Sequence, residues 1–268
     1  MAVIWGLDLK EMQWWKFKGS YMFNQTYHLR RTKMIIYQMA MILCVVSESV
    51  GTASLSDYVD EQDGIQTRDG RAAHVENNDI VGVLSYNIFV GVAVATIFGS
   101  GFFFDLFWPE RHESPSVKMA WRICSVLMCF FTLADAIALT VIVATHRAYI
   151  PGVPIELADF YFQQNGKPNP IYRKNPYNVA SCVILWPGFV ATCASTYIMW
   201  KSLEHNDKLG PFSSKYKNNT TGDKGEEASM EMPSTTPKPA APPTNDHSVL
   251  PTPTEPAPAH TTTPYPGT

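Results

Sequence analysis

The sequence predicts an all-α membrane protein: a four-helix transmembrane bundle followed by a disordered C-terminal tail. Three observations support this fold class. Four segments are long and apolar enough to cross a bilayer. The connections between them divide lysine and arginine unevenly. From about residue 204 the chain becomes polar and rich in proline and threonine, a composition that cannot bury enough apolar surface to fold.

Residues 1–33 are aromatic and basic, and this segment is expected in the cytosol. Tryptophan and tyrosine favour the headgroup layer, and lysine and arginine are drawn to anionic lipid. An interfacial segment is therefore one interpretation. An irregular arm packed on the bundle is the other, and composition does not choose between them.

The clearest span is predicted at residues 80–106. No charge occurs over the 25 residues from Ile80 to Phe104. At ~1.5 Å per residue a helix of this length covers about 37 Å, more than the ~30 Å of a bilayer's hydrocarbon core.

The other three spans are predicted at residues 34–55, 118–145 and 179–201, so that a transmembrane domain covers residues 34–203. The first is interrupted by Gln38 and Glu48, the third contains Asp135, and the fourth is uncharged from Val179 to Trp200. The acidic connection 56–79 and the longer, proline-rich connection 146–178 are expected to be loops on the outer side.

The distribution of positive charge predicts the orientation. If the N-terminus is inside, thirteen lysines and arginines up to Lys217 lie on the cytosolic side and six lie on the other. Cytosolic connections carry the excess of these residues. We therefore expect a multi-pass protein, placed at the plasma membrane, with both termini in the cytosol.

The tail, residues 204–268, is predicted to be disordered and cytosolic. Two PxxP matches occur in it, Pro239–Pro242 and Pro253–Pro256, and such segments bind SH3 or WW domains. Matches of this kind also arise by chance in any proline-rich tail. A cytosolic SH3- or WW-type partner is thus one hypothesis, and a plain tether is the other.

A polar site inside the membrane is predicted from helix rise. Glu48 and Asp135 fall in the outer half of their spans, and Tyr86 and Asn87 reach the same level from the antiparallel second span. A carboxylate is costly in the membrane, so these acids are expected to face the bundle interior, protonated or paired. The four side chains form either a site for a proton, cation or small polar ligand, or interhelical hydrogen bonds that only fix the packing.

Two further features of the second span are expected to be structural. Gly91, Ala95 and Gly99 form a row of small residues that lets helices approach closely, within the chain or between copies. Asp105, near the cytosolic end, is expected to pair with Arg111 or Arg122.

The sequence gives no sign of an enzyme, a cofactor or a metal site. All seven histidines lie in loops, termini or helix ends, which argues against intramembrane haem ligation or a His-based catalytic pair. The five cysteines all lie in apolar segments, so no disulfide framework is expected outside, and no zinc or phosphate-binding motif occurs. A net charge of −3 gives no basic field that would indicate nucleic acid.

Residues 104–114 (FDLFWPERHES), Ala120-Trp-Arg and residues 133–145 (LADAIALTVIVAT) resemble uncharacterised four-span integral membrane proteins of filamentous fungi. The topology also resembles that of MARVEL-type tetraspan proteins. The resemblance implies a fold but no activity. We therefore predict a non-enzymatic tetraspan that organises lipids or partner proteins, including further copies of itself, with the tail as tether. The alternative is a small oligomeric transporter or channel that uses Glu48 and Asp135.

Overall fold

A computed structural model describes residues 3–4, 7–68 and 74–213. The predicted all-α bundle is confirmed, because four helices are long and apolar enough to cross a membrane. These helices are α2 (Arg30–Arg68), α3 (Asn78–Phe107), α4 (Pro115–Thr145) and α6 (Pro176–Leu209). The shorter elements are β1 (Val3–Ile4), β2 (Leu7–Asp8), η1 (Leu9–Glu11), η2 (Trp14–Phe17), α1 (Gly19–Met22), α5 (Ile155–Asn165) and η3 (Tyr172–Lys174).

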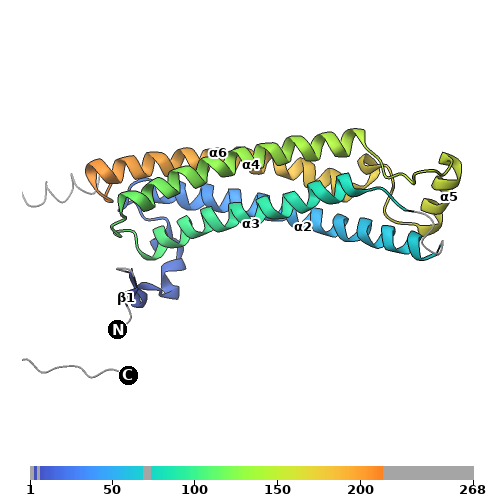
Figure 1. The fold of residues 1–268 in the computed structure, drawn as a ribbon. Coiled ribbons are helices and arrows are strands. Elements are labelled where there is room, and N and C mark those ends of the chain that lie inside the picture. Colours follow the sequence, from blue (N-terminus) through green and yellow to red (C-terminus); the bar gives the residue numbers. More distant parts are fainter. Residues whose placement is uncertain (1–2, 5–6, 69–73, 214–268) are drawn as a thin grey trace, which may run out of the picture. The chain divides into compact units, whose positions relative to one another are not determined.

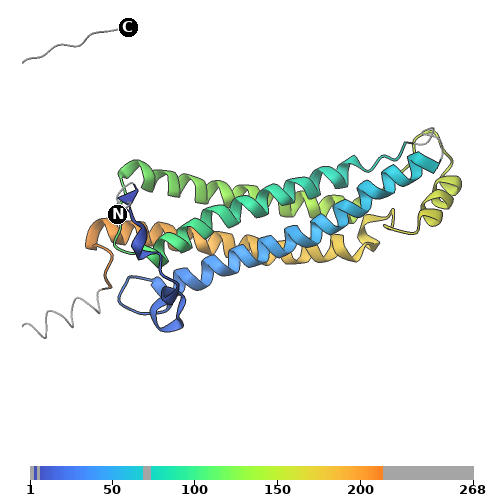
Figure 2. The same cartoon turned by 90° about the horizontal axis from the view of Figure 1, so that it is seen from below.

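The four long helices lie side by side and alternate in direction (Figures 1 and 2). Helix α2 packs against α3 and α6, and α4 packs against the same two helices. The N-terminal elements lie at the end where α2 begins, and α5 lies at the opposite end (Figure 1). We call the former the arm end and the latter the α5 end.

The helix boundaries follow local signals in the sequence. Ser114 caps α4 by accepting a hydrogen bond from the backbone N–H of Val117 (3.4 Å), and Pro115 occupies the first turn. Asn175 and Pro176 repeat this arrangement at α6. Helix α6 ends at Gly210, whose φ of 78° lies in the left-handed region that glycine adopts easily.

The bundle interior combines two hydrophobic clusters with many polar side chains, and the exterior of the long helices is apolar. Many of its buried side chains are polar: Ser47, Ser54, Asn87, Ser125, Thr132, Asp135, Asn178, Ser181, Thr192 and Ser195. Large apolar side chains point outward from the same helices, among them Ile42, Phe89, Val92, Phe103, Phe130, Ile137, Val183 and Val190. The exterior of a soluble bundle is instead polar and charged. The chain is a multi-pass membrane protein.

Helix α2 continues well beyond the predicted span and ends at Arg68. The prediction that residues 56–68 form a loop is therefore wrong. Tyr58 and Ile65 are buried on this extension, in a cluster that includes Ala158 and Phe162 of α5. Packing against α5 therefore keeps this acidic stretch helical outside the apolar span.

Helix α6 also runs past its predicted span, so that residues 204–209, assigned to the tail, are helical. The remainder of the tail, residues 214–268, lies outside the described residues. The predictions of disorder and of a PxxP partner concern that part of the chain.

Candidate functional site

In the half of the bundle nearer the α5 end, three helices meet in a polar network. Ser47 of α2 donates to the backbone carbonyl of Ser181 on α6 (2.9 Å), and the two hydroxyl oxygens lie 3.1 Å apart. The amide of Asn87 on α3 donates to the Ser181 hydroxyl (3.1 Å). One predicted residue, Asn87, therefore joins α2, α3 and α6 through hydrogen bonds.

The other predicted residues occupy separate positions. Glu48 is partly exposed and packs on Gly91 in the seam between α2 and α3. The Tyr86 hydroxyl lies 3.4 Å from the carbonyl of Phe131 on α4. Asp135 is fully buried, and neither carboxylate oxygen has a hydrogen-bond partner among the described residues. The structure thus brings Asn87 into a network with serines, whereas Glu48 lies at a helix–helix seam.

The row of small residues lies against α2. A Cβ atom at Gly91 would come within 2.8 Å of the Glu48 Cβ, and one at Gly99 would lie 3.1 Å from the sulfur of Met41. Ala95, between them, is partly buried. Gly91 and Gly99 therefore serve close packing within one chain.

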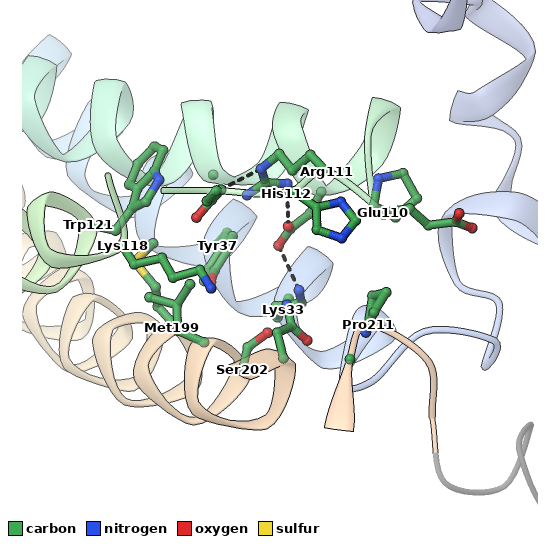
Figure 3. Close-up of a pocket in the computed structure, with 17 residues that line it drawn as sticks. Lys33, Tyr37, Glu110, Arg111, His112, Lys118, Trp121, Met199, Ser202 and Pro211 are labelled. Carbon is green, nitrogen blue, oxygen red and sulfur yellow. Dashed lines mark hydrogen bonds and ion pairs between the residues drawn. The ribbon is translucent and has the colours of Figure 1, made fainter. Parts of the chain in front are cut away.

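At the arm end the four long helices enclose a cavity of about 170 Å³, which we call the end cavity (Figure 3). Its deeper part is lined by Tyr37, Gly101 and Met199. Its outer part is lined by charged and polar side chains: Lys33, Asp105, Glu110, Arg111, His112, Glu113, Lys118, Trp121, Ser202 and Asn206. Sequence reasoning did not find this cavity, because its walls come from four distant parts of the chain.

A run of alternating charges forms one wall of the end cavity (Figure 3). The Lys33 ammonium lies 2.8 Å from the Asp105 carboxylate, and the Arg111 guanidinium lies 3.0 Å from it. Arg111 also pairs with Glu113 at 2.5 Å. All four side chains are largely buried. The predicted pairing of Asp105 with Arg111 is confirmed, while Arg122 instead pairs with Asp207.

Two polar atoms in the lining residues have no partner among the described residues. One is the indole N–H of Trp121, a donor, and the other is Oε2 of Glu113, an acceptor. Buried polar atoms ordinarily have a partner. Both atoms are buried within the wall of the end cavity, so they add no accessible donor or acceptor to its surface.

The chain that follows α6 is fastened to the N-terminal segment beside this cavity. The N–H of His28 donates to the Pro211 carbonyl (3.0 Å), and the N–H of Ser213 donates to the Thr26 carbonyl (2.9 Å). The rings of His28 and His205 stack with their centroids 3.5 Å apart. We call residues 25–28 with 210–213 the clip.

We predict that the clip opens at low pH. Burial, and then the charges of His205, Lys33 and Lys201, lower the pKa of His28 from 6.5 to about 4. As the pH falls from 6.5 towards 4, His28 gains a proton in the open clip but not in the closed one, so the closed state loses stability.

The measurement is amide hydrogen exchange at His28 and Ser213, corrected for intrinsic rates. As the pH falls from 7 to 4.5, the equilibrium constant for opening the clip should rise roughly tenfold. This figure is reduced to allow for solvent screening of the partly exposed His28 ring. The control is His28→Phe, which keeps an aromatic ring without a titratable group. Equal pH responses in the two proteins would assign the effect to another group.

Comparison with known proteins gives no relative from which a function can be transferred. A scan against protein-family models, a search of curated proteins and a search of solved structures each return no match. Within the described residues, no group of three histidine, cysteine, aspartate or glutamate side chains is placed to hold a metal ion. The functional interpretation therefore depends on the geometry of the bundle and the end cavity.

Proposed function

We propose that this chain is a non-enzymatic tetraspan membrane protein that organises lipids, and that the end cavity binds a lipid headgroup. The observation that carries the proposal is the position and chemistry of that cavity. It lies where the apolar spans end, which is the level of the headgroup layer. Its lining offers charged side chains of both signs, among them Lys33, Asp105 and Lys118.

The setting of the cavity supports a lipid ligand. Lys118 and Trp121 lie in the first two turns of α4, where the spans meet the polar layer. The cavity floor, formed by Tyr37, Gly101 and Met199, is largely apolar. A charged rim above an apolar floor suits a molecule with a polar head and a hydrocarbon tail.

The placement in the cell is part of the same proposal. Both termini lie in the cytosol, because most lysines and arginines flank the arm end. Long uncharged stretches such as the one from Ile80 to Phe104 suit the thicker hydrocarbon core of the plasma membrane. The PxxP segments of the tail would add a cytosolic SH3- or WW-type partner.

We predict that filling the end cavity removes bound lipid. Ser202 lines the cavity and is buried, so Ser202→Phe places a ring in the space that a headgroup would occupy. Native mass spectrometry of protein extracted with its own lipids should show phospholipid adducts in the unaltered chain and few in the variant. The matched control is Val190→Phe, which adds a ring on the exposed surface.

Two outcomes would contradict the proposal. If the unaltered chain retains no phospholipid, the end cavity does not bind a lipid headgroup. Equal retention by Ser202→Phe and Val190→Phe would place bound lipid on the outer surface. Circular dichroism of each variant establishes that the bundle is intact before lipid is counted.

A small transporter or channel is the second candidate, and Asp135 favours it. A buried carboxylate without a hydrogen-bond partner among the described residues is costly in a membrane, and such residues often mark proton or ion pathways. Flux of protons or cations into liposomes should then fall on changing Asp135→Asn and Glu48→Gln together. If the unaltered chain carries no flux, transport is rejected.

A further inference from the structure

The described part of the N-terminal segment before α1 forms an arm with two unlike faces. This arm, residues 7–17, comprises β2, η1 and η2. Lys16 is only 3% exposed, whereas Trp14 is 87% exposed and Trp15 is 48% exposed. The arm therefore buries the Lys16 cation, which pairs with Glu11, and exposes two indole rings together with the polar side chains of Lys10 and Gln13.

The inward face is fixed to the end of α3. The Lys16 ammonium donates to the carbonyl of Phe107 (2.9 Å), one of the last carbonyls of α3, which lack partners within the helix. The helix dipole makes this end negative, so a cation is favoured there. The indole N–H of Trp108 donates to the Asp8 carbonyl (2.9 Å) and holds the start of the arm.

Ring contacts join the arm to the membrane-facing surface of α3. Phe103 of α3 is exposed and stacks on Phe107, with centroids 6.3 Å apart. Phe107 contacts Phe17 of the arm at 5.7 Å, and Phe17 stacks on Trp14 at 5.8 Å. A chain of ring contacts, which passes through the buried ring of Phe107, thus leads from the apolar exterior of α3 to Trp14 of the arm.

We propose that the arm is a bilayer anchor: Leu9, Met12, Trp14 and Trp15 lie in the headgroup layer of the leaflet at the arm end, held there by Lys16. All four side chains are exposed. They begin where the apolar span of α3 ends, which is the depth that tryptophan prefers in membranes. The occupant of this surface is lipid, because ring contacts join the arm to Phe103, whose exposed side chain lies on the apolar exterior of α3.

This proposal unites the two interpretations of the aromatic and basic N-terminus. The arm packs on the bundle through its cation and meets the membrane through its tryptophans. It does not depend on a ligand in the end cavity.

The test measures the depth of position 14 in vesicles. A nitroxide is attached to the cysteine of Trp14→Cys, in a chain from which the other cysteines have been removed. The labelled protein is reconstituted into vesicles of zwitterionic and anionic phospholipid. The ratio of its accessibility to oxygen over that to a water-soluble nickel complex should be several-fold higher than for a nitroxide at Lys208→Cys. Lys208 lies at the same end, and its side chain is 69% exposed.

The role of Lys16 is tested in the same system. Lys16→Met should lower the ratio at position 14 towards that at position 208, whereas Lys16→Arg should preserve it. An unchanged ratio in Lys16→Met overturns the assignment of Lys16. A low ratio in the unaltered background places the tryptophan in water, and protection from both reagents indicates a protein partner; either result overturns the anchor.

A second measurement covers the case in which the cysteine-free chain does not fold. 5-Fluorotryptophan is incorporated into the full chain, and the Trp14 resonance is assigned by its loss in Trp14→Phe. Lipid-borne nitroxides should broaden this resonance more than a soluble gadolinium chelate does. The opposite order overturns the anchor.

Discussion

Asp105→Asn is expected to lower the free energy of unfolding by about 3–5 kcal/mol, the range found when one partner of a buried ion pair is removed. Asp105 is the only acid that both Lys33 and Arg111 contact among the ion pairs of the described residues. Neutralising it leaves two cations close together in a largely buried site. Unfolding in mixed detergent micelles, followed by circular dichroism, measures the loss.

A matched control lies at the same end of the bundle. Asp207 also pairs with two cations, Lys118 and Arg122, but it is well exposed. Exposed pairs contribute little to stability, so Asp207→Asn should leave the unfolding midpoint nearly unchanged. Equal losses from the two substitutions would show that burial does not govern the Asp105 cluster.

A second substitution tests the cause of the loss. Adding Lys33→Met to Asp105→Asn removes one uncompensated cation, while Arg111 keeps its pair with Glu113. The double variant should recover part of the lost stability, so that the two changes are not additive. A simple sum of the two single effects would contradict this account.

The positions of the spans were predictable because hydropathy reports directly on contact with lipid. The extension of α2 was not, because outside the membrane only tertiary packing keeps that segment helical. Tyr58, Glu61 and Ile65 are buried there, one helical turn after the buried Ser54 at the end of the predicted span, and the spacing of the four is helical. Two of the four are polar, and this conceals the apolar stripe that would have indicated a helix.

The candidate site shows a related limit. Helix rise gives the depth of a residue, but each step also turns it by about 100°, and the turn decides which side chain faces inward. The Ser47 hydroxyl therefore meets Ser181 in the interior, whereas its neighbour Glu48 lies in the seam with α3. Helix rise alone therefore could not give the direction of Glu48.

The end cavity could not be predicted, because its lining residues are far apart in the sequence. Arg111 is six residues from Asp105, so their pairing followed from helix geometry and a short turn. Lys33 lies on another helix, and no local signal joins it to Asp105. The arm was equally ambiguous, because aromatic and basic residues favour both a lipid surface and a packed contact, and only burial separates the two roles.

Gly91→Ala is expected to destabilise the bundle by about 1–3 kcal/mol, the usual effect of overpacking. The new Cβ would lie 2.8 Å from the Glu48 Cβ, an atom fixed to the α2 backbone, so the two helices must move apart. Elsewhere in a helix, glycine to alanine is favourable by up to ~1 kcal/mol. The same unfolding assay in micelles measures the change.

Gly99→Ala is the matched control for the same helix pair. Its Cβ would meet the sulfur of Met41 at 3.1 Å, the end of a flexible side chain that can shift. We therefore expect a change near zero or a small gain in stability. Glu48→Ala should recover only part of the Gly91→Ala loss, because it removes the carboxylate but keeps the Cβ. Equal losses of stability at the two glycines would mean that α2 and α3 move apart equally easily at both positions. Full recovery by Glu48→Ala would assign the clash to the Glu48 carboxylate alone.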